Sequence, residues 1–282
     1  MQKLAIFRPI NLIIIALNIV IVDFFIFNDR QDFQDHFILL VLKIIIMVSL
    51  AASGNVINDY FDQKSDAINR PAHQKVGRSI SVQGALRWHI LLTALALVFS
   101  AVLSLMTGYL LFFVIASIYA FVLYIYTPVI KRIPVLGNLT IAVCVAFLPI
   151  WTILGNDSPN PDQWIRIIWL CLFALISNFI REWVKDVQDE AGDRHQGYKT
   201  APVRWGVSLS KKIIQFLWLL MTALAVVFSY EHFSYTTCIL VALPQVMGWF
   251  PLWIVRAQGD WSRISFLLKL NMVLGMMGIL LS

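Results

Sequence analysis

Three polar residues repeat at helical spacing directly after a long apolar run. Asn58, Asp62 and Asp66 are four residues apart, so on an α-helix they share one face, because each step rotates by only ~40°. Like charges at this spacing destabilise a helix by about 0.2–0.5 kcal/mol per pair. A divalent cation would turn that repulsion into coordination, and an all-oxygen donor set favours Mg²⁺ over zinc. The stretch therefore indicates a candidate Mg²⁺ site.

A second acidic cluster repeats the pattern far along the chain. Asp189 and Asp193 are again four residues apart after another apolar run, with Asp186 one turn earlier, and Asp59 adds a carboxylate to the first cluster. A solvated, helix-capping loop is the plain alternative. Two matched clusters disfavour it, because ionisable groups at membrane depth cost on the order of 3 kcal/mol each and are usually functional. The match also suggests two related halves of the chain.

Basic side chains accompany both clusters. Mg²⁺ held by one or two carboxylates and surrounded by cations is a recurrent phosphate site, in which Arg and Lys bind the remaining oxygens. Each basic residue alone is explained by the usual excess in cytoplasmic loops, but together they point to a diphosphate. They are Arg70, Lys75 and Arg78, then Lys131 and Arg132, then Lys185, Lys199 and Arg204.

A diphosphate at the mouth of an apolar helical bundle suggests a lipid-like tail between the helices. Prenyl diphosphates have this shape, and their C–O bond ionises when a metal and cations stabilise the departing diphosphate. No Ser or Cys nucleophile with a His base is evident in the sequence, so covalent catalysis is disfavoured.

The composition predicts an integral membrane protein that holds these clusters. Of its 282 residues 59% are hydrophobic and 13% charged, with a mean hydropathy of +0.76, whereas soluble domains carry about a quarter charged residues. We expect one all-α domain, 1–282, in which runs of about twenty apolar residues cross the bilayer, with loops at 59–87 and 182–212. The nine expected spans are 10–27, 37–58, 88–106, 109–126, 135–154, 164–181, 213–230, 235–255 and 263–281.

The basic residues also predict the orientation. With the N-terminus in the cytoplasm, eighteen of the 22 Lys and Arg residues lie in cytoplasmic segments, and only Arg30 and Arg166 lie in the opposite loops. This orientation places both acidic clusters on the cytoplasmic side and the C-terminus outside. In a prokaryote the membrane would be the cytoplasmic membrane. The net charge of +6 then reflects topology and contact with anionic lipids, not nucleic-acid binding.

With these motifs the chain resembles the UbiA superfamily of intramembrane prenyltransferases. The family pattern is NDxxDxxxD after the second helix and DxxxD after the sixth, and here the motifs read NDYFDQKSD (58–66) and DEAGD (189–193). The resemblance implies that these residues hold two Mg²⁺ ions and a prenyl diphosphate. We therefore expect the metal ligands among Asn58, Asp59, Asp62, Asp66, Asp186, Asp189 and Asp193.

The same resemblance implies the other site residues. A family Tyr–Lys pair after the fourth helix is similar to Tyr126 and Lys131, although four residues intervene here where some members have three. The expected catalytic residues are Asp62, Asp66, Asp189, Asp193 and Lys131. The expected substrate-binding residues are Asn11, Asn58, Arg70, Tyr126, Lys131, Arg181, Lys185 and Lys199.

Within the superfamily, the stretch REWVKDVQDEAGDRHQGYKTAP (181–202) is most similar to the digeranylgeranylglyceryl phosphate synthase branch. Lys185 and Asp186 separate it from the hydroxybenzoate branch, which generally lacks this KD, while menaquinone enzymes favour RD. Ala201 replaces the usual Leu before Pro202. The branch implies transfer of a prenyl group, expected to be geranylgeranyl, from its diphosphate to the hydroxyl of a prenylglyceryl phosphate, which makes an ether lipid.

Two alternatives stay open at this point. One is an aromatic prenyltransferase of quinone biosynthesis, with hydroxybenzoate or dihydroxynaphthoate as the acceptor. The other is not an enzyme but an ion-coupled transporter or a lipid-binding membrane protein. Transporters more often place ionisable groups mid-membrane, where this chain has only Asp23, Lys43 and Lys269.

Overall fold

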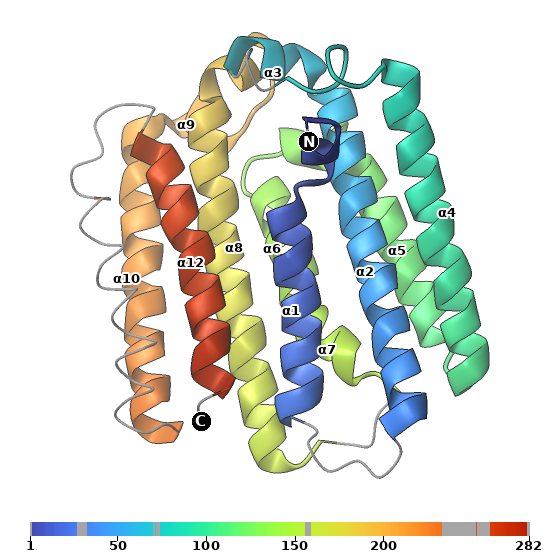
Figure 1. Ribbon diagram of the computed structural model, residues 1–282. Helices are drawn as coiled ribbons and strands as arrows, with labels where there is room; N and C mark the ends of the chain where they lie inside the picture. Colours follow the sequence, from blue (N-terminus) through green and yellow to red (C-terminus); the bar gives the residue numbers. More distant parts are fainter. Residues whose placement is uncertain are drawn as a thin grey trace. The chain divides into compact units, whose positions relative to one another are not determined.

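The computed structural model describes residues 2–26, 33–69, 71, 74–155, 159–232, 252 and 260–280. Figure 1 shows helices throughout this part of the chain, so the predicted all-α class is confirmed. The α-helices are α1 (Pro9–Ile26), α2 (Phe33–Phe61), α3 (Gln63–Asn69), α4 (Val82–Thr107), α5 (Leu111–Tyr126), α6 (Leu136–Ala146), α7 (Leu148–Ile153), α8 (Pro161–His195), α9 (Ala201–Trp205), α10 (Val207–His232) and α12 (Asp260–Leu280). Two short 3₁₀ segments are η1 (Gln2–Phe7) and η3 (Ile130–Arg132).

Five stretches of the described chain are long and apolar enough to cross a membrane: His36–Phe61, Val82–Thr107, Leu136–Ile153, Pro161–His195 and Val207–Phe228. The shorter apolar helices Pro9–Phe24 and Leu111–Tyr126 accompany them. The predicted span 135–154 is divided between α6 and α7. The predicted span 235–255 lies almost wholly outside the described residues, so the count of nine stays a prediction.

The chain divides into two compact units, each built around one helix. The first unit comprises residues 1–130 and 148–159. In it α2 packs against α1, α4 and α5, while α1 also packs against α7. Lys43, in the middle of α2 and 2% exposed, donates a hydrogen bond from Nζ to the carbonyl of Thr152 near the end of α7 at 2.7 Å. A cation stabilises the carbonyls at a helix C-terminus, which accounts for this charge inside an apolar span.

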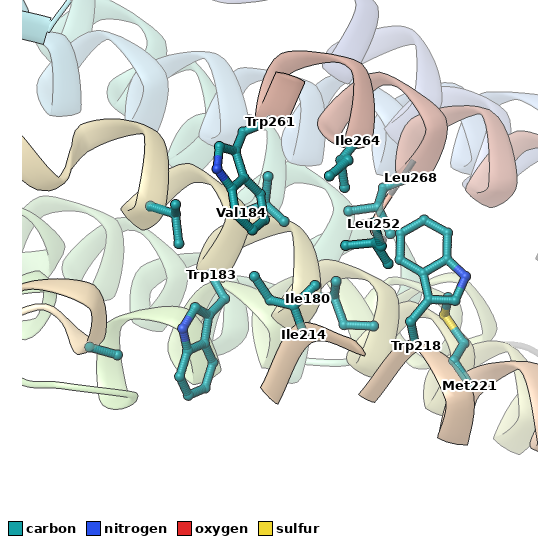
Figure 2. Packing of buried hydrophobic residues seen from close by; sticks show 12 residues of the cluster. Ile180, Trp183, Val184, Ile214, Trp218, Met221, Leu252, Trp261, Ile264 and Leu268 are labelled. Carbon is teal, nitrogen blue, oxygen red and sulfur yellow. The ribbon is translucent and has the colours of Figure 1, made fainter. Parts of the chain in front are cut away.

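The second unit comprises residues 131–147 and 160–282. Here α8 packs against α6, α10 and α12, and the core between them is apolar (Figure 2). Its aromatic members Trp183, Trp218 and Trp261 come from α8, α10 and α12. Burying such large side chains contributes much of the stability of a helical core. The second acidic cluster therefore stands on a helix that is held from several sides.

The helix α8 continues beyond the end that the sequence suggested. The predicted span ended at Arg181 and a loop was expected over 182–212, but α8 continues to His195. No proline lies within residues 182–195. The first glycine after them, Gly197, is in the left-handed conformation with φ of +73°, which favours termination of the helix after His195. The predicted loop 182–212 thus begins as helix, and the second motif is entirely helical.

Candidate functional site

The first motif lies in the first unit, where α2 passes into α3. The amide of Asp62 donates to the carbonyl of Asn58 at 2.9 Å, and the amide of Asp66 donates to that of Asp62 at 2.8 Å. Helical hydrogen bonding therefore continues through the junction, and the three residues share one face. Asp62 is buried, and Oδ1 of Asn58 accepts a hydrogen bond from the Thr127 hydroxyl at 2.7 Å. Sequence reasoning did not identify Thr127.

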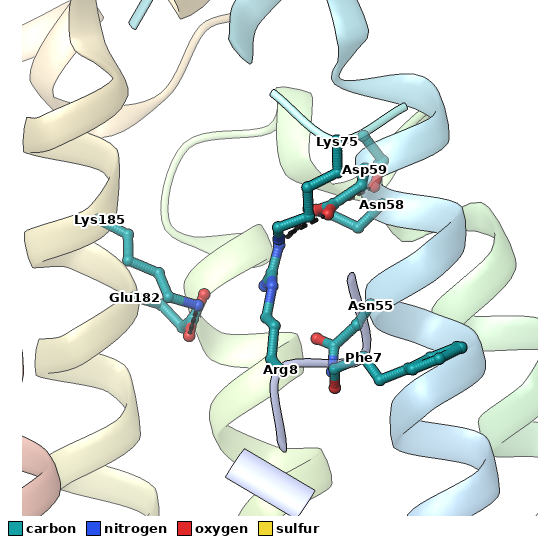
Figure 3. A network of polar contacts seen from close by, with 9 residues as sticks. Phe7, Arg8, Asn55, Asn58, Asp59, Lys75, Glu182 and Lys185 are labelled. Atoms are coloured by element: carbon teal, nitrogen blue, oxygen red, sulfur yellow. Dashed lines mark hydrogen bonds and ion pairs between the residues drawn. The ribbon is translucent and has the colours of Figure 1, made fainter. Parts of the chain in front are cut away.

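Asp59, which follows Asn58 on α2, contacts two cations. Its Oδ1 accepts from Nη2 of Arg8 at 2.7 Å, and its Oδ2 accepts from Nζ of Lys75 at 3.0 Å. One turn earlier on α2, Nδ2 of Asn55 donates to the carbonyl of Phe7 at 3.0 Å. Figure 3 shows Arg8 pointing at the Asp59 carboxylate, with Lys75 beside it. Both oxygens of this predicted metal ligand are therefore in ion pairs.

The second motif lies on the last turns of α8, in the second unit. Asp193 is fully buried, and its Oδ1 lies 3.9 Å from Nζ of Lys131. Asp186 is also buried, and its Oδ2 accepts a hydrogen bond from Nδ2 of Asn138 at 2.8 Å. Asp189, between them on the same helix, is half-buried. The start of α6 and the η3 turn are thus attached to α8 at the motif.

Tyr198 joins the η3 turn to the segment after α8. Nζ of Lys131 lies 5.7 Å from the centroid of the Tyr198 ring, and the Arg132 guanidinium carbon lies 5.1 Å from it. Cations at such distances are attracted by the ring quadrupole. Sequence reasoning missed Tyr198, because no local pattern marks its contacts with Lys131 and Arg132, which lie far away in the chain.

Val135, at the start of α6, has a φ of +68°, an unfavourable conformation for a β-branched residue.

A buried carboxylate also organises the predicted basic residues of α8. Oε1 of Glu182 accepts from Nη1 of Arg181 at 2.9 Å and from Nζ of Lys185 at 2.6 Å. Glu182 and Arg181 are both buried. Sequence reasoning identified the two cations but not the carboxylate that contacts both. Glu182 and Lys185 are three residues apart on a helix, so this ion pair could have been predicted.

The remaining predicted site residues are more scattered. Asn11 is half-buried in the first turn of α1, Tyr126 is the buried last residue of α5, and Asp66 is half-buried in α3. Lys199 is exposed between α8 and α9. Arg70 lies outside the described residues.

The donor chemistry of both motifs fits Mg²⁺. Carboxylate and amide oxygens are its usual protein ligands, and it is commonly held by one or two carboxylates together with substrate phosphates. Among the described residues, no three Asp, Glu, His or Cys side chains form a group that could hold a metal ion.

Comparison with known proteins now decides the family. A sequence model described as the UbiA prenyltransferase family matches residues 12–273. This chain belongs to the UbiA prenyltransferase family. The family predicted from the two motifs is confirmed, and with it the enzyme class and a place in the membrane.

Individual UbiA relatives match over nearly the whole chain. A digeranylgeranylglyceryl phosphate synthase of Korarchaeum cryptofilum is 32% identical over 247 residues, covering 86% of this chain and 85% of the relative. The one of Methanopyrus kandleri is 26% identical over 277 residues, covering 98% and 96%. A solved UbiA homolog from Archaeoglobus fulgidus, bound to GPP and Mg²⁺, has a TM-score of 0.64 at 18% identity and covers 99% of both chains. This structural similarity supports the UbiA fold.

Proposed function

We propose that this protein transfers a geranylgeranyl group from its diphosphate to the free hydroxyl of a prenylglyceryl phosphate, with Mg²⁺ as cofactor. The observation that carries the proposal is the similarity to two digeranylgeranylglyceryl phosphate synthases over 85% and 96% of their lengths. The KD pair Lys185–Asp186, typical of that branch, supports the same acceptor.

The site residues are proposed to act on the diphosphate. Asn58, Asp62 and Asp66 in the first motif, and Asp189 and Asp193 in the second, would hold Mg²⁺. Bound Mg²⁺ supplies charge stabilisation to the leaving diphosphate. The buried side chain of Lys131 is proposed to bind a diphosphate oxygen, and two further predicted cations, Arg70 and Lys199, to bind the others.

The proposed transfer needs no reactant other than the prenyl diphosphate and the acceptor. The bond between C1 of the prenyl chain and the diphosphate oxygen breaks, and both electrons leave with the diphosphate. The acceptor hydroxyl oxygen then bonds to C1, and its proton passes to a carboxylate or to the released diphosphate. Excluding water from the allylic cation requires an apolar enclosure, which the family's membrane helices are proposed to provide.

The proposed orientation follows from the basic residues. The N-terminus and both motifs would face the cytoplasm, where the positively charged segments are expected to lie. The prenyl diphosphate would then reach the site with its charged end at the cytoplasmic surface and its tail in the bilayer.

The proposal is tested with purified protein, Mg²⁺ and geranylgeranyl diphosphate. Geranylgeranylglyceryl phosphate, hydroxybenzoate and dihydroxynaphthoate are offered in separate reactions, and the products are identified by mass. We expect an ether product from the glyceryl phosphate. A product from an aromatic acid alone would contradict the acceptor, and ion or lipid flux with no prenyl transfer would favour the transporter.

A further inference from the structure

The cap that ends α8 joins the second acidic motif to Tyr198. The amide of Tyr198 donates a hydrogen bond to the carbonyl of Asp193 at 2.9 Å, and the amide of Gly197 donates to the carbonyl of Arg194 at 3.1 Å. With Gly197 in the left-handed conformation, these two bonds form a Schellman motif, in which the residue after the glycine returns to the last turn of the helix. The backbone therefore fixes Tyr198 relative to Asp193.

The ring of Tyr198 contacts the η3 turn within the same unit. Nζ of Lys131 lies 5.7 Å from the ring centroid, and the guanidinium carbon of Arg132 lies 5.1 Å from it. Tyr198 is 5% exposed and Lys131 is 9% exposed, whereas Arg132 is exposed. A contact between a cation and a ring is stronger where water is excluded, so we expect the ring to matter more for Lys131 than for Arg132.

The side chain of Lys131 gains a fixed position from this contact. A lysine has a flexible four-carbon stem and lacks the planar group that gives arginine its direction. Nζ of Lys131 lies 3.9 Å from Oδ1 of Asp193, which is longer than a hydrogen bond, so this ion pair attracts Nζ without directing it. The ring and the carboxylate both belong to the capped end of α8, and together they hold Nζ beside the second motif.

Apolar packing of the cap would not require an aromatic residue at this position. An apolar contact commonly accompanies a Schellman motif, and an aliphatic side chain would supply it. The quadrupole of an aromatic ring adds an attraction for a cation that an aliphatic side chain lacks. Tyr198 thus links the end of the second motif to the lysine that is proposed to bind the diphosphate.

We infer that Tyr198 is a positioning residue that holds Lys131 at the second motif and thereby raises the affinity for the donor diphosphate. This inference rests on the proposed binding of a diphosphate oxygen by Lys131. A lysine that is already held beside the motif loses less conformational freedom when the diphosphate binds. Contact between Tyr198 itself and the substrate is not required.

The test compares Tyr198→Leu, which keeps an apolar side chain at the cap but removes the ring, with Tyr198→Phe, which keeps the ring. We expect Tyr198→Leu to raise the KM for geranylgeranyl diphosphate about threefold to thirtyfold, the range for a lost contact between a cation and a ring. The KM for geranylgeranylglyceryl phosphate should stay nearly unchanged, and Tyr198→Phe should keep the donor KM of the unmodified protein. An equal rise of the donor KM in both variants, or no rise in Tyr198→Leu, would overturn the inference.

A double-mutant cycle separates the positioning of Lys131 from general packing. Lys131→Met removes the amine but keeps a long side chain. If the ring acts through Lys131, Tyr198→Leu raises the donor KM no further in the Lys131→Met background, because the effects of coupled residues are not additive. The full rise should persist in an Arg132→Met background. The same rise in the Lys131→Met background, or its loss only with Arg132→Met, would contradict the inference.

A matched control makes the same substitution at an exposed tyrosine. Tyr230 on α10 is 79% exposed, and Tyr230→Leu should leave both KM values unchanged. Calorimetric binding of geranylgeranyl diphosphate with Mg²⁺, without acceptor, distinguishes this inference from the proposed function. If the unmodified protein binds the diphosphate but forms no ether, the proposed function fails. In that case weaker binding by Tyr198→Leu still supports the positioning role, and equal binding refutes it.

Discussion

Nδ2 of Asn138 donates a hydrogen bond to Oδ2 of Asp186 at 2.8 Å, which joins the start of α6 to the helix that carries the second acidic motif. Both side chains are buried. Their contact fixes a carboxylate of the candidate site relative to α6, and it gives Asn138 a structural reason to stand at the first turn of that helix.

Asn138→Leu should destabilise the protein, because the change leaves the buried Asp186 oxygen without this donor. The expected loss is about 1–3 kcal/mol in the free energy of unfolding, the usual cost of such a lost partner. Thermal unfolding in detergent measures it. Leu139→Ala, at an exposed neighbour on α6, is the control. Equal stability of the Leu variant and the unmodified protein would show that the hydrogen bond contributes nothing.

Trp218→Ala should also destabilise the second unit, where this fully buried side chain belongs to the core formed with α8 and α12. Truncating a buried aromatic residue costs about 3–5 kcal/mol. Phe216, two residues earlier on α10, is 65% exposed, so Phe216→Ala is the control. Equal unfolding temperatures of Trp218→Ala and Phe216→Ala would contradict this contribution of the Trp218 side chain to stability.

Asp189→Ala should lower turnover by about a hundredfold or more while the protein stays folded, since it removes a proposed Mg²⁺ ligand. Asp62→Ala tests the first motif in the same way. The control is Glu190→Ala, which removes the neighbouring carboxylate on α8 that instead pairs with the exposed Arg194. Steady-state assays with a folding check by gel filtration give the answer. Full activity of either aspartate variant would refute the metal assignment at that motif.

Local spacing made the shared helical face of Asn58, Asp62 and Asp66 predictable, because the i, i+4 relation is a property of the helix alone. The partners of Asp59 were not predictable, since Arg8 lies 51 residues away in the chain and reaches it only through burial of Ile6 and Val76.

The same contrast holds in the second unit. Asp186 could be identified from its place one turn before Asp189, but Asn138 lies 48 residues away from it. The end of α8 was also misjudged, because an apolar run indicates where a span lies but not where a helix that leaves the membrane stops.

The most direct measurement is the mass of the product that the purified protein forms from geranylgeranyl diphosphate and geranylgeranylglyceryl phosphate. We predict digeranylgeranylglyceryl phosphate with release of diphosphate, loss of the product when EDTA removes Mg²⁺, and its recovery when Mg²⁺ is restored. No ether product under these conditions, or undiminished product without a divalent metal, would contradict the account.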